Sequence, residues 1–504
     1  MEENRVYYKE LACYEKELKK QIKIKCQDGY FDLMELPTNI MREEMRSYIF
    51  ERGKTVSYST ICHDKTYYKQ VCSFLCQKNL QNVNSFLDIP QEKWIQLLKG
   101  WMLQTGKPLT YEKPNVFGTK NVITAYLIQY FKQFLIFLQP EDEQDEITKD
   151  IWRLDTLGIE VKKNPIYNVV TLNFSKIVQP DIREEVKRAI FMNLHYEAVG
   201  TVQRELSAIR KFSGYLKKEH PEINSCIDID RVILEGFLIH QNTENSSHKS
   251  NSDNVIKLRN VLEGIGKLYG YSNLDSLFLN TDVPPEIQPE FKNYSDAEIK
   301  RLNAKITELD EQIARCLVIH QMLGTRISDT LTLECDCLYM ENEQNMIRIH
   351  QVKTKTFEKP ISAELSKLIQ MALDYTRSKY GETKYIFVDE ENSSRPMQYT
   401  TIVHKIRGMI LKENLLDDAG NLFKFSTHLF RHYYGVKLTE MHLDDWTIAR
   451  LLGHKRLGSV QHYRKMSNQK MADETRDIRN MMTEILYKTL DGWGEEYEQI
   501  RQND

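Results

Sequence analysis

Gly324-Thr-Arg-Ile-Ser-Asp329, His428-Leu-Phe-Arg-His432 and Leu451-Leu-Gly-His454 follow one another in the C-terminal part of this 504-residue chain. Lys353-Thr-Lys-Thr356 lies between the first two stretches, and Tyr463 follows nine residues after His454. Together the stretches supply two guanidinium groups, imidazoles, ammonium groups, a carboxyl group and a phenol in a fixed order. The fold is expected to bring these groups into one site.

The two arginines and the tyrosine form a chemically coherent set. Arg326 and Arg431 are permanently charged, and each can bind two oxygens of a phosphate. Two such groups around one phosphate would stabilise the negative charge of phosphoryl transfer. Tyr463 can attack phosphorus and hold it covalently. Because a free phenol has a pKa near ~10, its attack at neutral pH requires a cationic site or a base.

The remaining ionisable residues have supporting roles in this interpretation. His428 lies three residues before Arg431, so both share one helical face and can reach one phosphate. His454 can donate a further hydrogen bond to that phosphate, and Lys355 is a candidate general acid for the departing oxygen. Asp329 is expected to orient the other residues of the cluster without contacting the phosphate itself. Each residue alone has an ordinary structural explanation, such as a surface ion pair. The joint order and spacing favour a catalytic site.

These motifs resemble those of the tyrosine recombinases of the phage integrase family. The family's Gly-x-Arg-x-x-(Glu/Asp) motif matches residues 324–329, and its His-x-x-Arg-His box matches residues 428–432. Its Leu-Gly-His box matches residues 452–454, and its tyrosine follows that histidine by nine residues, as Tyr463 does. The resemblance covers roughly residues 294–470. It implies cleavage and rejoining of DNA through a 3′-phosphotyrosine.

The family's lysine lies in a β-hairpin turn after the first arginine. Here Met346-Ile-Arg-Ile-His350 alternates like a strand, and the lysines follow at its turn. Lys355 fits the family pattern best, and Lys353 is the alternative.

The resemblance also implies a fold class. We expect a mainly α protein with a small antiparallel β-sheet, in which helical N-terminal DNA-binding domains precede a mixed α/β catalytic domain. Prolines between residues 280 and 289 exclude a continuous helix there, and Ser295-Asp-Ala-Glu298 predicts a helix start through a capping box. The expected divisions are a helical domain at 1–145, a connector at 146–177, a core-binding domain at 178–280, a linker at 281–293, a catalytic domain at 294–470 and a helical tail at 471–504.

An internal repeat precedes the catalytic segment. Val71-Cys-Ser-Phe-Leu75 and Asn84-Ser-Phe-Leu-Asp-Ile89 correspond to Phe212-Ser-Gly-Tyr-Leu216 and Asn224-Ser-Cys-Ile-Asp-Ile229. The first helical domain is therefore interpreted as a relative of the core-binding domain, although convergent helical patterning would give similar segments. It would serve either a longer DNA footprint or a protein contact.

The composition is that of an ordinary globular protein, 41% apolar and 28% charged. The net charge of −3 is unusual for a DNA-binding protein and predicts segregation of basic groups near the motifs. A polar start and the lack of membrane-length apolar runs indicate a cytoplasmic protein without a membrane partner. Nine cysteines form no metal-spaced quartet. With neither a phosphate-binding glycine loop nor an acidic metal cluster, no cofactor and no metal are expected.

The predicted function is that of a site-specific DNA recombinase of a mobile element, an integrase or a transposase. The predicted partners are double-stranded DNA at specific sites, further copies of the chain in a synaptic tetramer, and accessory DNA-binding proteins. The tail could pack on a neighbouring protomer or on its own. The alternatives are a type IB topoisomerase and a catalytically silent DNA-binding member of the fold.

Overall fold

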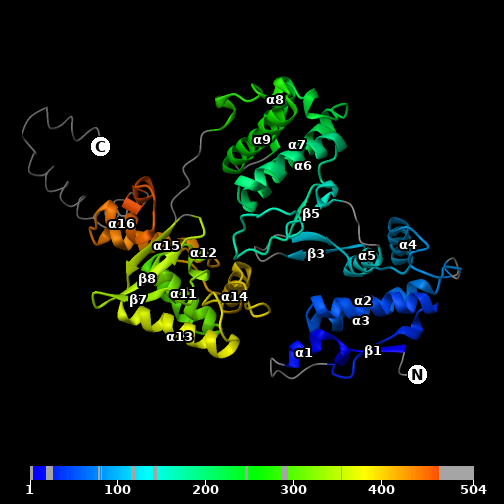
Figure 1. Ribbon diagram of the computed structural model, residues 1–504, viewed down its shortest axis with the longest axis horizontal. Coiled ribbons are helices and arrows are strands. Elements are labelled where there is room, and N and C mark those ends of the chain that lie inside the picture. The colour runs from blue at the N-terminus through cyan, green and yellow to red at the C-terminus, as the bar shows by residue number, and fades with distance from the viewer. Residues whose placement is uncertain are drawn as a thin grey trace, which may run out of the picture. The chain divides into compact units, whose positions relative to one another are not determined.

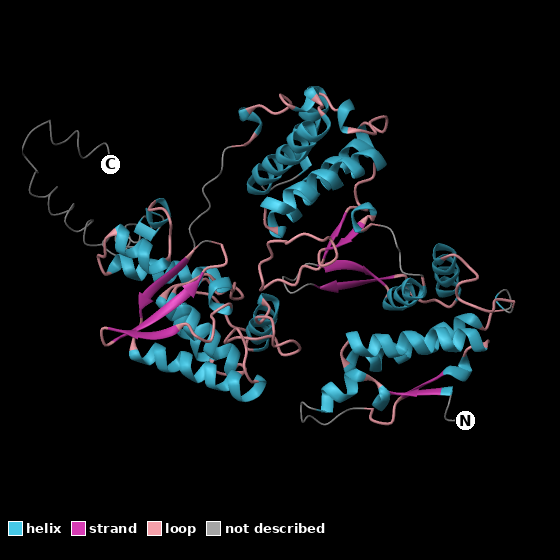
Figure 2. Cartoon of the chain, viewed as in Figure 1, coloured by secondary structure: helices cyan, strands magenta, loops and turns pink. Residues whose placement is uncertain are grey.

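The computed structural model describes residues 4–18, 26–77, 80, 82–114, 120–139, 145–244, 248–284, 293–353, 355–461 and 463–464. It divides into two compact units, Met1–Gln144 and Asp145–Asp504. Helices predominate, and the strands pair into small antiparallel sheets (Figures 1 and 2). The expected fold class is therefore confirmed.

The first unit is helical around an aromatic core. The Trp94 indole donates a 2.8 Å hydrogen bond to the Phe86 carbonyl, and the Phe86 and Phe134 rings meet edge to face with centroids 4.6 Å apart. Such ring geometry adds to the stabilisation from burial. The described elements are β1 (Arg5–Tyr7), α1 (Ala12–Leu18), β2 (Tyr30–Asp32), α2 (Asn39–Thr55), α3 (Tyr58–Leu75), α4 (Gln91–Gln104), β3 (Thr110–Pro114), β4 (Lys120–Thr124) and α5 (Tyr126–Leu138).

A second helical domain occupies residues 145–283. Its elements are β5 (Ile151–Arg153), β6 (Thr171–Asn173), α6 (Pro180–Tyr196), α7 (Val199–Glu219), α8 (Arg231–Glu244) and α9 (His248–Tyr269). Trp152 and Phe174 are completely buried in the same core as the helices, with ring centroids 4.4 Å apart. The prediction of a connector at 146–177 is therefore wrong, because these residues pair as a two-stranded ribbon and contribute large side chains to the core.

The two helical domains repeat one pattern of burial. Every buried position between residues 31 and 75 has a buried counterpart 141 positions later. The polar contacts repeat as well. Glu44 accepts hydrogen bonds from Ser85 Oγ and from the next backbone N–H, and Glu185 accepts the same pair from Ser225 Oγ (2.6 Å) and the N–H after it (2.9 Å). Further matched pairs are Arg42–Leu36 O with Arg183–Ile177 O, and Arg52–Asp64 with Asn193–Glu205.

The part of the chain from residue 294 onward contains a three-stranded antiparallel sheet in the order β7-β8-β9. Its elements are α10 (Asp296–Ile306), α11 (Glu311–Leu323), α12 (Ile327–Leu331), β7 (Leu338–Glu341), β8 (Gln344–His350), β9 (Thr356–Pro360), α13 (Ala363–Tyr380), α14 (Tyr399–Lys412), α15 (Thr427–Glu440) and α16 (Asp445–Leu452). The strand predicted at 346–350 lies within β8. The capping box is confirmed, since Ser295 Oγ accepts from Glu298 N–H and Glu298 accepts from Ser295 N–H, both at 3.0 Å.

Some expectations fall outside the described residues. They concern the tail at 471–504 and most of the linker at 281–293, of which residues 285–292 are not described. In the part of the chain that is described, no helix combines the length and apolar character needed to cross a membrane. Cys72, Cys226, Cys316 and Cys337 are buried as free thiols, whereas Cys76 is exposed.

Candidate active site

The first arginine motif is a sharp junction between two helices. α11 ends at Leu323 and is capped by Gly324, whose φ of 61° is in the left-handed region. A Cβ there would lie 2.3 Å from the Tyr434 ring, so both conformation and space require glycine. Arg326 then precedes the first turn of α12, with 27% of its side chain exposed. The junction thus presents a partly accessible guanidinium group at the edge of a packed core.

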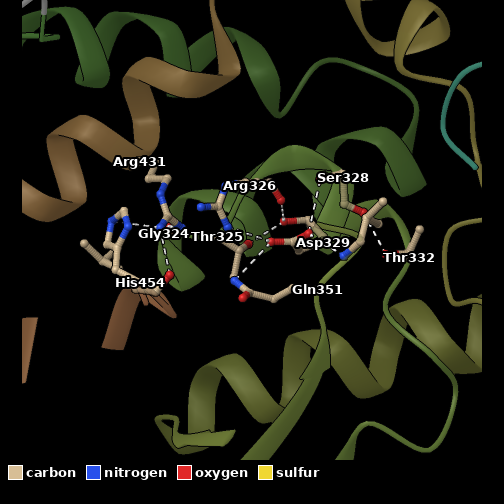
Figure 3. A network of polar contacts seen from close by, with 12 residues as sticks. Gly324, Thr325, Arg326, Ser328, Asp329, Thr332, Gln351, Arg431 and His454 are labelled. Atoms are coloured by element: carbon tan, nitrogen blue, oxygen red, sulfur yellow. Dashed lines mark hydrogen bonds and ion pairs between the residues drawn. The ribbon is translucent and has the colours of Figure 1, made fainter. Parts of the chain in front are cut away.

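Asp329 connects this arginine to the segment that carries the lysines. Its side chain is buried, and Oδ2 lies 3.8 Å from Arg326 Nη1. Oδ1 accepts a 3.2 Å hydrogen bond from the Val352 backbone N–H, and Gln351 Nε2 donates to Oδ2 at 3.4 Å (Figure 3). Burial raises the pKa of Asp329, against the Val352 hydrogen bond and the charge of Arg326. The carboxylate therefore holds the first motif against the turn after β8.

Arg431 lies on α15 and is only 1% exposed. Its Nη1 donates to the Gly324 carbonyl at 2.9 Å, and its Nη2 donates to the Leu452 carbonyl at 2.7 Å and to His454 Nε2 at 3.1 Å (Figure 3). Burial lowers the pKa of Arg431, although a guanidinium group remains protonated at neutral pH. One side chain thus joins the first motif to the Leu-Gly-His motif.

Tyr463 lies inside the same cluster. Its side chain is 4% exposed, and its phenol oxygen is 3.4 Å from His454 Nε2. Its ring packs on Gly435 of α15, where a Cβ would come within 2.9 Å of the ring. Burial raises the pKa of Tyr463, while the nearby charges of Arg431 and Arg326 lower it. The cationic surroundings required for phenol ionisation are therefore present.

The two predicted histidines differ in their surroundings. Burial, followed by the charges of Arg431 and Arg326, lowers the pKa of His454 to about 3, so its ring is neutral at physiological pH. Because Arg431 donates to Nε2, this nitrogen is an acceptor. His428 lies nearer the surface of α15, and its ring centroid is 4.4 Å from that of His432. Partial burial and then His432 lower the pKa of His428 to about 4.

An open cleft of about 890 Å³ adjoins the cluster. Its lining includes His454 and Lys355, the latter exposed just before β9. Lys353 is also exposed but is not part of the lining among the described residues. Other lining residues include Gln351, Phe357, Trp446, Arg450, Lys455 and Arg456. The predicted segregation of basic groups is therefore visible at the mouth of the site.

Two buried residues were not predicted. His320 of α11 accepts from Thr330 Oγ1 through Nδ1 (2.9 Å) and donates from Nε2 to the Thr427 carbonyl (3.0 Å), beside His428. Burial lowers the pKa of His320 to about 4. The other is Lys359 of β9, whose ammonium group lies within the core. The β9 alternation places Lys359 on the inner face with Phe357, which is the signal that could have identified it.

Comparisons with known proteins find similarity over the segment that contains these residues. Residues 292–470 match the model described as "Phage integrase family". Transposase B from transposon Tn554 of Staphylococcus aureus is 22% identical over 405 residues, which cover 78% of this chain and 64% of that protein. The chain thus spans somewhat less than two thirds of that relative's length. Tyrosine recombinase XerC of Rickettsia canadensis is 24% identical over 283 residues, covering 55% of this chain and 88% of that protein.

Among solved structures, the XerH site-specific recombinase bound to palindromic difH substrate is 15% identical. The match covers 60% of this chain and 91% of the XerH chain, with a TM-score of 0.45. The family match coincides with the segment that carries the arginine, histidine and tyrosine motifs. Residues 292–470 are therefore similar to the phage integrase family of tyrosine recombinases.

Proposed function

We propose that the chain is a site-specific DNA recombinase that cleaves and rejoins DNA through a 3′-phosphotyrosine on Tyr463. The observation that carries the proposal is the position of the Tyr463 phenol, 3.4 Å from a neutral His454 that Arg431 holds in place. Arg326 lies at the same cluster with 27% of its side chain exposed. The transposase and tyrosine recombinase names of the relatives support the same reaction class.

Each residue of the cluster has a separate role in the proposed cleavage reaction. Arg326 and Arg431 bind the scissile phosphate and stabilise the charge of the transition state. The Tyr463 oxygen forms a bond to phosphorus as the bond to the 5′-oxygen breaks. The phenol proton leaves to water as Tyr463 attacks, favoured by the charges of Arg431 and Arg326, and His454 adds a hydrogen bond to the phosphate. Lys355 gives a proton to the departing 5′-oxygen. The products are a 3′-phosphotyrosine and a free 5′-hydroxyl.

Strand exchange is the reverse step with a different partner. A 5′-hydroxyl from a second duplex attacks the phosphotyrosine, which restores the phenol and joins the new strands. Because the phosphotyrosine retains the bond energy, nucleotide hydrolysis is unnecessary. In this proposal the chain moves a mobile element, acts in the cytoplasm on the nucleoid, and assembles as a tetramer with accessory DNA-binding proteins.

The test uses nicked suicide substrates made from the DNA that flanks the chain's own gene. Wild-type protein should form an adduct that survives denaturing electrophoresis, and Tyr463→Phe should form none while binding DNA normally. Tyr433→Phe is the matched control, because Tyr433 lies on α15 and bonds to Asp296 outside the cluster. An adduct in Tyr463→Phe would overturn the assignment. The absence of any adduct with wild-type protein would favour a silent DNA-binding protein.

A second assay separates recombination from topoisomerase activity. Two duplexes that carry the cleaved site should exchange strands in the presence of this protein. Relaxation of any supercoiled plasmid without exchange would favour the topoisomerase alternative.

The role of Lys355 can be tested by changing the leaving group. Lys355→Ala should slow cleavage of a normal phosphodiester by about 10²-fold or more. A substrate with sulfur at the 5′-bridging position should restore the rate, because a thiolate leaves without a proton. Lys353→Ala is the matched control, since Lys353 is equally exposed but outside the cleft lining. Sulfur rescue of Lys353→Ala alone would transfer the role to Lys353.

A further inference from the structure

Lys359 is a buried ammonium group that the reaction above does not use. Its side chain is 3% exposed on β9. Nζ donates to the Leu323 carbonyl at 2.5 Å and to the Leu451 carbonyl at 3.4 Å. It also lies 5.1 Å from the centroid of the Tyr434 ring. These contacts reach the C-terminal ends of α11 and α16, where the helix dipoles favour a cation.

Arg431 makes the matching pair of bonds one residue further along both segments. It donates to the Gly324 and Leu452 carbonyls, which directly follow the two carbonyls that Lys359 binds. Two cations from different elements therefore bridge the same two chain segments at consecutive carbonyl groups. One segment leads into Arg326 and the other into His454.

The position is costly for a charge. Burial, followed by the charge of Arg431, lowers the pKa of Lys359 to about 7. An uncharged side chain of similar length, such as methionine, would fill the same volume without desolvation of an ammonium group. The ammonium group is therefore a poor choice for stability alone. What methionine lacks is directional hydrogen bonds to both segments.

We propose that Lys359 is a positioning residue that fixes the register between the Arg326 segment and the His454 segment. Its ammonium group and the Arg431 guanidinium group form two parallel cross-links, so that Arg326 and His454 face one phosphate. Lys359 also belongs to the strand that begins directly after Lys355, and it thereby ties the general acid to the same frame. The proposal deepens the proposed function and rests on it for its catalytic consequence.

The primary test compares Lys359→Met with Ile347→Met. Ile347 is the partner of Lys359 across the β8–β9 pair and is completely buried, so its variant controls for altered packing in the same hairpin. Lys359→Met should fold and bind DNA with unchanged affinity but cleave about 10- to 100-fold more slowly, as expected for a small misplacement of reacting groups. Ile347→Met should stay within about threefold of wild type.

The leaving-group assay distinguishes positioning from proton donation. The 5′-bridging sulfur substrate should rescue Lys355→Ala and should not rescue Lys359→Met. Sulfur rescue of Lys359→Met would overturn the proposal in favour of a direct acid role. An equal loss of DNA affinity and cleavage rate would also overturn it, because the residue would then serve general folding.

A measurement without DNA keeps the inference independent of the reaction. Amide hydrogen exchange should accelerate in Lys359→Met at residues 323–326 and 451–454 together, and neither segment should respond to Ile347→Met. Unchanged exchange at either segment would contradict the cross-link. Wild-type protein that forms no adduct would count against the proposed function alone, whereas this exchange result would count against the role of Lys359.

Discussion

The first unit and residues 145–283 can be compared position by position, because every buried position of residues 31–75 has a buried counterpart in residues 172–216. In each domain one glutamate binds the turn that precedes the next helix. In each, an arginine near the start of a helix donates to a carbonyl six residues earlier. We infer that the two domains are copies of one duplicated domain. Their cores have changed in sequence but retain several matched contacts.

The surfaces of the matched helices α3 and α7 differ much more than the cores. Four cations are exposed on α7, namely Arg204, Lys211, Lys217 and Lys218. The matched positions around α3 carry no permanent charge, namely His63, Gln70, Cys76 and Gln77. The lysines described on α3 are Lys65 and Lys69, which match Leu206 and Arg210. The shared core shows common architecture, whereas the charge difference leads us to expect more phosphate contacts on α7 than on α3.

The largest effect is expected from neutralising the exposed face of α7. Replacement of Lys211, Lys217 and Lys218 by alanine should weaken DNA binding by on the order of 10²-fold and lower the slope of log affinity against log salt by about three units. The measurement is titration of a long duplex at several salt concentrations. Alanine at the matched positions Gln70, Cys76 and Gln77 should change neither quantity. Equal losses of DNA affinity and of salt slope in both variants would contradict the proposed difference in DNA binding between α7 and α3.

A second prediction concerns the shared core. Glu185 also accepts from Tyr271 Oη at 3.2 Å, a contact that has no equivalent at Glu44 among the described residues. Glu185→Ala should therefore destabilise its domain by about 2–3 kcal/mol, and Glu44→Ala should destabilise the first unit somewhat less, because each change leaves buried donors unsatisfied. Peptide-resolved hydrogen exchange on the full chain can measure both. Unchanged hydrogen exchange in either variant would show that the substituted glutamate does not stabilise its domain.

The smallest effect is expected from deletion of the first unit. Residues 145–504 should fold and still cleave a core site, with a salt slope less than about one unit below that of the full chain. The shortened protein must begin at residue 145, because Trp152 belongs to the core of the second copy. A loss of two or more units would show that the first unit contacts DNA through another surface. An unchanged slope with loss of tetramer formation would instead favour a protein-contact role.

The sequence predicts those parts of the molecule whose signals are local. The β8 alternation, the capping box at Ser295 and the order of the arginine, histidine and tyrosine motifs all depend on short spacings. The structure brings Arg326, Arg431, His454 and Tyr463 into one cluster, and it places Lys355 at the adjoining cleft. The assigned roles of these residues stay predictions until tested.

The missed features depend on contacts between distant residues. The ribbon formed by β5 and β6 joins two three-residue strands separated by a long loop, so no local pattern identifies it as part of a core. Lysine is a residue type that is usually exposed, and only the pairing of β9 with β8 places Lys359 in the protein core. His320 is similar, since its two hydrogen-bond partners lie 10 and 107 residues away in sequence. Such placements follow from packing, which a single sequence does not specify.

We propose that Tyr463 forms the covalent bond to DNA. The adduct can be trapped on a nicked substrate, the DNA and the protein digested, and the remaining nucleotide located by mass spectrometry. We expect a 3′-phosphonucleotide on the peptide that contains Tyr463 and none on peptides that contain Tyr433 or Tyr434. A nucleotide attached to any other side chain, or an active protein that yields no covalent adduct, would contradict it.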